Sequence, residues 1–365
     1  KFAEPNIIPS GQEIINKLYP LTVRVDSSGE HFNHRLLYDT NYPLSNEMRR
    51  KTPSIKGITL DKPTVLHRPE NHLICRLIKY GGQYMITRKS GYLQVKQHDQ
   101  APPESLILEQ SGACKLERVY TREEVQALKK EITDIYENQV PDGRNPHRPN
   151  DIDEHFRYEM LNRSQACQEA IGNERLLAVI EPLLGEDCHV IANTAWRNPA
   201  NPNDPSQAWH IDAGPHIPLP EGMIWPAGIP NPIFAIGCHI LLQSCGLEDG
   251  PTGIIAGSHL SGRSPPSDRL FDPELSFNGE AVSPLTGDPG DVLLFVSDVW
   301  HRRLPTGSHD QGRFFLQVHY GRRDIQQRLQ TTEQTNQLSQ AAIQRATSRK
   351  RKTLIGLHRP GFYDG

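Results

Sequence analysis

The spacing of apolar residues changes along the chain, and each spacing predicts a different kind of element. Thr121 and Glu124 form a capping box, which marks the start of a helix. Apolar residues then recur at helical spacing, at Val125, Leu128, Ile132 and Ile135. A second stretch of this kind follows Asn173 and ends at Gly185. We therefore expect two amphipathic helices, each packed with its apolar face on another layer.

Between Cys188 and about Tyr320 the helical spacing disappears. Clusters of Pro, Gly, Asn and Asp separate short apolar runs there, namely HVIANTAW, PIFAIGCHILLQ, DVLLFV and RFFLQVHY. Short runs with this punctuation are typical of an antiparallel sandwich or barrel. The fold class that we expect is an all-β core with flanking helices (α+β).

The two ends of the chain show other patterns. Residues 1–70 are punctuated by proline, with one short helical stretch at 12–18. From His72 onward, three β-favouring runs predict a hairpin or meander, and Pro102-Pro103 favour an extended connection. The C-terminal segment predicts a Gln-rich helix that ends in a basic run. We divide the chain into an N-terminal extension (1–105), a central domain (106–325) and a C-terminal helix and tail (326–365).

Composition narrows the range of partners. Lys and Arg number 40 and Asp and Glu 43, which gives a formal net charge of -3 and no overall basic field that favours nucleic acid. No apolar run reaches the roughly 18 to 20 residues that cross a bilayer, and the N-terminus lacks a signal-peptide pattern. The six cysteines are scattered without a CxxC pair. We expect a cytoplasmic protein with reduced thiols that binds neither nucleic acid nor a membrane.

The β-rich region contains a candidate metal site. In WHID, His210 and Asp212 are two residues apart, so both side chains point to the same face of a strand. His301 follows the apolar strand of GDPGDVLLFVSDVW and offers a second imidazole. Two His and one carboxylate form the facial triad of non-haem iron(II) oxygenases, which leaves positions open for a 2-oxo acid and dioxygen. A zinc hydrolase with the same three ligands is an alternative.

The strand in GRFFLQVHY adds a candidate co-substrate residue. Alternation places Arg313, Phe315, Gln317 and His319 on one face. An Arg inside a barrel needs an anionic partner, and a guanidinium can hold the distal carboxylate of 2-oxoglutarate in a bidentate pair. The alternative is a surface Arg at the start of a strand. Because a zinc hydrolase needs no such Arg, replacement of Arg313 separates the two enzyme classes.

These segments together resemble the phytanoyl-CoA dioxygenase family of iron(II) and 2-oxoglutarate-dependent oxygenases. The resemblance spans about residues 112–323 and rests on WHID, LEDGPTGIIAGSH, GDVLLF followed by WHR, and the Arg beyond it. It implies a double-stranded β-helix (a jelly roll of the cupin kind), with Fe(II), 2-oxoglutarate and O2 as cofactor and co-substrates. By position it implies His210, Asp212 and His301 as the catalytic iron ligands and Arg313 as the co-substrate residue.

The resemblance also points to residues around these ligands. Asn193 and Arg197 lie where relatives often place a co-substrate or substrate contact. Members often carry Ser or Thr two positions after the distal His, whereas this chain has Arg303 there, and Thr306 is the nearest substitute. We expect Asn193 and Thr306 to contact the co-substrate, and Arg197 and Arg303 to contact the substrate.

The side chains that we expect near the ligands favour a polar substrate. They are a cationic and aromatic set, namely Trp209, His216, Trp225, His239, Arg263, Arg302 and His319. Cationic residues around a small site favour a carboxylate-bearing molecule. We expect a small metabolite or natural-product precursor that is hydroxylated, desaturated or cyclised, with Trp209, His216 and His239 as substrate contacts. A His such as His239 is as often a buried residue satisfied by its neighbours.

Two other functions remain open. The N-terminal extension could recruit a polypeptide, which would make the protein a peptide hydroxylase of the same cofactor class. The chain could instead be a barrel-shaped binding module without catalysis, although the complete set of His210, Asp212, His301 and Arg313 argues against a decayed site. A substrate screen that separates peptides from small metabolites distinguishes the first of these.

Overall fold

The computed structural model describes most of the chain beyond residue 100. Residues 101–138, 155–212, 214–227, 229–327, 329 and 338–358 are described in full, and the strands at 23–24, 31–32, 84–89 and 92–97 by their backbone. The predicted helical stretch at 12–18 and the first β-favouring run from His72 lie outside the described residues. Within the described parts, every helix is too short or too polar to cross a lipid bilayer.

A six-stranded antiparallel sheet forms the centre of the molecule. Its strands lie in the order β5-β11-β8-β13-β7-β6. Their bounds are Ala113–Leu116 (β5), Val292–Val296 (β11), Ala235–Leu241 (β8), Arg313–Gly321 (β13), His189–Asn198 (β7) and Phe156–Arg157 (β6). Strands that are distant in sequence are neighbours in this order, so the sheet joins the whole region from residue 113 to residue 321.

A smaller sheet faces the large one. It has three antiparallel strands in the order β10-β9-β12, with bounds Val282–Leu285, Thr252–Ile255 and His301–Arg303. A short 3-10 helix, η2 (Ser258–Ser261), follows β9. Small groups of buried residues fill the space between the two sheets, among them Ile254, Phe295 and Val299. This arrangement of two antiparallel sheets is the double-stranded β-helix that was expected.

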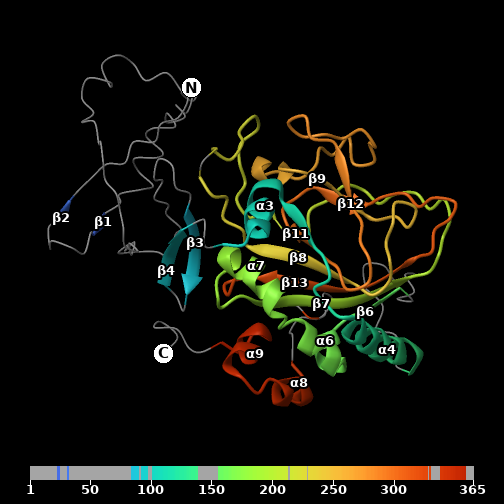
Figure 1. The fold of residues 1–365 in the computed structure, drawn as a ribbon. Helices are drawn as coiled ribbons and strands as arrows, with labels where there is room; N and C mark the ends of the chain where they lie inside the picture. The colour runs from blue at the N-terminus through green and yellow to red at the C-terminus, as the bar shows by residue number, and fades with distance from the viewer. Residues whose placement is uncertain are drawn as a thin grey trace, which may run out of the picture.

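Helices cover the other face of the six-stranded sheet, as Figure 1 shows for α4, α6 and α7. The helices are α3 (Pro103–Ser111), α4 (Arg122–Asn138), α5 (Met160–Arg163), α6 (Gln165–Ala170), α7 (Glu174–Leu184), α8 (Gln340–Arg345) and α9 (Arg349–Leu354). The largest hydrophobic core lies between these helices and the sheet, and it contains Leu128, Ile132, Leu176, Leu316 and Tyr320. Burial of this apolar layer is the main force that holds helices and sheet together.

Strand β13 divides its side chains between the two faces. Residues packed in the helix-side core alternate along it, namely Phe314, Leu316, Val318 and Tyr320. The intervening residues point toward the smaller sheet, namely Arg313, Phe315, Gln317 and His319. We call these the outer face and the inner face of the six-stranded sheet. The alternation predicted for Arg313 to His319 is therefore confirmed.

Several local predictions are confirmed. The Thr121 hydroxyl accepts a hydrogen bond from the Glu124 backbone N–H, and the Glu124 carboxylate accepts one from the Thr121 backbone N–H. Asn173 caps α7 through its side-chain oxygen. Strands β3 (Tyr84–Lys89) and β4 (Tyr92–Gln97) pair as a hairpin, as the second and third β-favouring runs predict.

Two local predictions are wrong. Pro103 does not lie in an extended connection, because it is the first residue of α3, where a missing N–H and a fixed φ suit a helix start. Residues 338–358 of the C-terminal segment form two short helices, α8 and α9, where one was expected. Ser348 caps the second of them through its side chain, which ends one helix and begins the next.

Gly237 shows how closely the inner face is packed. A Cβ built on Gly237 would lie 2.5 Å from the ring of Phe295 and 3.1 Å from Nε2 of His319. We predict that Gly237→Ala lowers the free energy of unfolding by about 1 to 3 kcal/mol, because the buried ring must move. Chemical denaturation measures this. Gly172→Ala is the matched control, since its nearest neighbour would lie at 3.5 Å, and equal effects of the two substitutions would contradict the prediction.

Candidate metal centre

The backbones of His210 and His301 are joined as an antiparallel bridge. The His210 N–H donates to the His301 carbonyl at 3.0 Å, and the His301 N–H donates to the His210 carbonyl at 3.0 Å. Residues paired in this way place their side chains on the same face. The bridge extends the three-stranded sheet by one pair at the end of β12, and it brings together two residues that are far apart in the chain.

Asp212 completes a group that could hold a metal ion. One ligand atom each from His210, Asp212 and His301 all lie within 4.8 Å of one another. The Asp212 Oδ1 atom lies 3.3 Å from Nε2 of His301 and 4.0 Å from Nε2 of His210. The Asp212 N–H donates to the Ser297 carbonyl at 3.0 Å, which fixes the backbone just before the strand that carries His301. The structure therefore brings the three predicted ligands together.

Both imidazoles are oriented with Nε2 toward this group. Nδ1 of His210 bonds to the Ala208 carbonyl at 2.8 Å, and Nδ1 of His301 bonds to the Val299 carbonyl at 2.9 Å. A carbonyl partner requires the proton on Nδ1, so each imidazole in its neutral form has its lone pair on Nε2. Two neutral imidazole nitrogens and one carboxylate oxygen are the donor set that suits iron(II). The residues present therefore fit the metal.

The carboxylate of Asp212 is held in its ionised form. Burial would raise its pKa, but the imidazoles of His301 and His319 hold the pKa well below its usual range. Its Oδ2 atom lies 2.9 Å from Nε2 of His319. Its other oxygen, Oδ1, faces His301 and His210. A ligand must be deprotonated before it can bind a metal, and this environment provides that state.

Access to the group is from the side of His210. The His210 side chain is 41% exposed, that of Asp212 22% and that of His301 only 6%. A metal with these ligands would therefore be reachable from solvent on one side and enclosed by the sheets on the other.

Arg313 and Arg303 are neighbouring guanidinium groups. The Arg313 side chain is buried, and one of its N–H groups donates to Asn198 Oδ1 at 3.2 Å. Within the described part of the chain, its Nε has no hydrogen-bond partner, and neither do Nε and Nη2 of Arg303. Burial and the neighbouring Arg303 lower the pKa of Arg313 to about 10, so the Arg313 guanidinium stays charged at neutral pH. Buried N–H donors without partners are costly, and an anion would satisfy them.

Two predicted contacts lie on the wrong face of the sheet. Asn193 pairs with Val318 and Arg197 with Phe314, so both share the outer face with these core residues. Asn193 is fully buried and donates to the Gln317 carbonyl, whereas the Arg197 guanidinium lies over the ring of Tyr136. The residues of β7 that face the metal group are their neighbours Thr194 and Trp196. A shift of one residue reverses the face of a strand, and the sequence alone did not set the phase.

Thr306 and Trp209, two further predicted contact residues, form hydrogen bonds with the protein backbone instead. The Thr306 hydroxyl donates to the Asn201 carbonyl at 2.6 Å and accepts from the Asp204 N–H at 2.8 Å, so its proton is not available to a co-substrate. Trp209 is buried behind the smaller sheet, and its indole N–H donates to the Asp272 carbonyl. Since His210 and Asp212 point inward, their neighbour Trp209 points away from the metal group.

His216 and His239 lie in different surroundings. Nδ1 of His216 is 2.6 Å from Oδ1 of Asp298, and its ring is stacked on Phe234. This contact joins the loop after Asp212 to the loop before His301. His239 is buried on the inner face, where its ring contacts Phe295 and Phe315. The structure describes both positions, and their contact with a substrate stays a prediction.

Three further inner-face residues contact one another beside Asp212, and of these only His319 was expected near the ligands. His319 binds the Asp212 carboxylate, Gln317 lies 3.3 Å from His319, and the Trp196 indole N–H donates to Gln317 at 2.5 Å. The signal for two of them was present in the sequence, because alternation already placed Gln317 and His319 beside Arg313. The pairing of β13 with β7, which adds Trp196, could not be read from it.

The comparisons with known proteins agree with this geometry. The sequence pattern of the phytanoyl-CoA dioxygenase (PhyH) family matches residues 108–313. The chain belongs to this family. The enzyme is therefore a 2-oxoglutarate-dependent non-haem iron dioxygenase that uses Fe(II), 2-oxoglutarate and O2. The match lies inside the predicted central domain, whose boundaries stay a prediction.

Several solved structures are similar to this chain. EctD from S. alaskensis with 2-oxoglutarate and 5-hydroxyectoine has 20% identity and a TM-score of 0.47, with 64% of this chain and 79% of that one covered. The epimerase SnoN with Fe3+, alpha ketoglutarate and nogalamycin RO has 12% identity and a TM-score of 0.47, with 65% and 92% covered. HygX from Streptomyces hygroscopicus with nickel and 2-oxoglutarate has 16% identity and a TM-score of 0.46, with 61% and 88% covered. No relative was found among curated proteins.

The buried His239 predicts a dependence of stability on pH. Burial lowers the pKa of His239 well below its usual value, and Arg313 and His319 lower it further. Below about pH 6.5 the unfolded chain binds a proton at His239 and the folded protein does not. The free energy of unfolding is therefore highest above about pH 6.5 and decreases as the pH falls below that value. We predict that His239→Gln reduces this slope by up to about 1.4 kcal/mol per pH unit.

Denaturant unfolding of the metal-free protein between pH 7.5 and 5 measures the slope. His309→Gln is the control, because the His309 side chain is exposed. Identical slopes for His239→Gln and the wild type would show that His239 is not the group that resists protonation.

Proposed function

We propose that the enzyme oxidises a C–H bond of a small molecule at an iron held by His210, Asp212 and His301. The observation that carries the proposal is the convergence of these three ligand atoms within 4.8 Å, with both Nε2 lone pairs directed by backbone carbonyls. When bound, the iron and the 2-oxo acid activate dioxygen for this oxidation. The residues of the chain hold the three ligands in place, keep Asp212 ionised and leave one side of the metal site accessible to solvent.

Arg313 and Arg303 together hold the distal carboxylate of the co-substrate in this proposal. His301 and Arg303 are two residues apart on β12, so Arg303 points to the same face as the metal ligand. One N–H group of Arg303 is fixed by Asp204 at 3.0 Å, which leaves the others in a defined direction. We therefore assign Arg303 to the co-substrate, where the predicted role was a substrate contact.

The substrate that we propose is a small metabolite or natural-product precursor. The sequence predicted a carboxylate on the substrate because several cationic residues were expected beside the metal group. Three of these residues have other contacts in the structure. Arg263 holds the backbone of Pro220 and Met223, Arg302 lies over Trp209, and Arg197 is on the outer face. The inner-face residues beside His319 are rings and neutral polar groups. They favour a substrate recognised by stacking and neutral hydrogen bonds, whether the outcome is hydroxylation, desaturation or ring closure.

Anaerobic titration with Fe(II) in the presence of 2-oxoglutarate tests the function. We expect a weak visible charge-transfer band of the chelate in the wild type and its loss in Asp212→Ala. Arg313→Gln and Arg303→Gln should each weaken the apparent affinity for 2-oxoglutarate by about tenfold or more, because a charged hydrogen bond is lost. Arg175→Gln removes an exposed guanidinium on α7 and should leave the titration unchanged.

The outcomes separate the competing functions. Bound metal without a band in the wild type would favour a zinc hydrolase, since a hydrolase needs no site for a 2-oxo acid. No metal binding at all would favour the binding module. A screen of small molecules against peptides, read by succinate formation, then separates the metabolite oxygenase from the peptide hydroxylase.

His319 is a positioning residue in this proposal, because it acts on the metal through Asp212. We predict that His319→Ala weakens Fe(II) affinity by about 10- to 100-fold, as the loss of such outer contacts does in other metal sites. His319→Gln keeps an N–H donor and should recover part of the loss. Anaerobic equilibrium titration measures the affinity, with His309→Ala as control. An unchanged affinity in His319→Ala would remove His319 from the metal site.

A further inference from the structure

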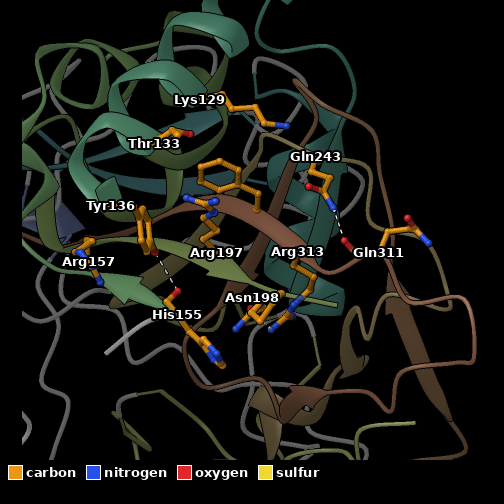
Figure 2. Close-up of a pocket in the computed structure, with 12 residues that line it drawn as sticks. Lys129, Thr133, Tyr136, His155, Arg157, Arg197, Asn198, Gln243, Gln311 and Arg313 are labelled. Atoms are coloured by element: carbon orange, nitrogen blue, oxygen red, sulfur yellow. Dashed lines mark hydrogen bonds between the residues drawn. The ribbon is translucent and has the colours of Figure 1, made fainter. Parts of the chain in front are cut away.

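A cavity of about 580 Å³ lies on the outer face of the six-stranded sheet, between α4 and the strands β6, β7 and β13 (Figure 2). Among the residues that the structure describes, its lining contains four cationic side chains together with His155, and no Asp or Glu. The lining residues are Lys129, Thr133, Tyr136, His155, Arg157, Arg197, Asn198, Pro199, Gln243, Gln311, Arg313 and Phe314. The metal group lies on the opposite face, so the proposed oxidation uses Arg313 but not Lys129, Arg157 or Arg197.

The cations of this cavity are held in place by aromatic rings. The guanidinium of Arg157 lies 4.4 Å from the ring centroid of Tyr136, and that of Arg197 lies 5.6 Å from it. The Tyr136 hydroxyl lies 3.0 Å from the carbonyls of His155 and Ala195, which fixes the ring against the sheet. Lys129 lies 5.7 Å from the ring centroid of Phe314. Figure 2 shows Lys129, Thr133 and Tyr136 on α4 facing Arg197 from β7.

Lys129 and Arg197 carry the positive charge on which this cavity depends. Among the described residues, neither Lys129 nor Arg197 forms an ion pair, and each has only its contact with a ring. Like charges held close together raise the free energy of the folded protein. Rings attract cations, but they leave the N–H donors of the guanidinium and the ammonium free to bind an anion.

We propose that this cavity binds a small anion with two or more negative charges, carried by phosphate or carboxylate groups. Arg197 offers a planar, bidentate donor pair, and Lys129 offers a point charge from the opposite wall. Thr133 adds a hydroxyl beside them. The volume lies in the range of small-molecule sites, and a concave wall suits a compact ligand better than a polymer.

Calorimetric titration of the metal-free full chain with pyrophosphate tests the site, and a parallel titration with citrate separates phosphate from carboxylate ligands. We expect saturable binding of at least one probe by the wild type. Arg197→Gln and Lys129→Gln should each weaken that binding by about tenfold or more. Lys130→Gln is the matched control on the same helix, because Lys130 is exposed and paired with Asp134 at 2.7 Å.

Arg303→Gln provides the second control, since the cavity reaches Arg313 at the start of β13. Arg303 does not line the cavity, so this substitution should leave probe binding unchanged. A loss in Arg303→Gln equal to that in Arg197→Gln would place the anion at the co-substrate site and overturn the proposal. No saturable binding of either probe, or equal binding by Arg197→Gln and the wild type, would also overturn it. Circular dichroism and thermal unfolding show that each variant is folded.

Discussion

The pair of backbone hydrogen bonds between His210 and His301 is the constraint on which the metal group depends. Each imidazole is oriented by a carbonyl two residues earlier in its own segment, so the backbone fixes both the position and the rotation of the ring. Asp212 then needs only the alternation of an extended chain to face the same point. His319 contacts the Asp212 carboxylate from the six-stranded sheet. This contact therefore depends on how the two sheets pack face to face.

Alternation along β7 and β13 gives the six-stranded sheet two different faces. On the inner face, Arg313, Gln317 and His319 serve the proposed metal and co-substrate sites. On the outer face, Phe314 and its alternate neighbours pack under the helices, and Arg197 joins the cationic cavity. The two sites are thus separated by the thickness of one sheet and share the strand β13. Arg313, at the start of β13, belongs to the proposed co-substrate site and also lines the cationic cavity.

Much of the fold and the ligand set followed from local patterns. Helical spacing with the caps at Thr121 and Asn173 gave α4 and α7, because caps and amphipathic faces are formed by residues close in sequence. The errors were of another kind. Asn193 and Arg197 were placed on the wrong face, since the phase of an alternating strand is set by its neighbours. Thr306 was assigned to the co-substrate, but its proton is used by a turn more than a hundred residues away.

The sequence by itself indicated the family, the three candidate metal ligands and the inward-facing Arg313, because residue type and short spacing carry that chemistry. Only the tertiary structure decided which side chains surround them. Trp196 comes to the proposed site through the pairing of β7 with β13, and Arg263 is held away from it by the backbone of Pro220 and Met223. Long-range register depends on the packing of the whole sheet, and no local pattern in the chain records it.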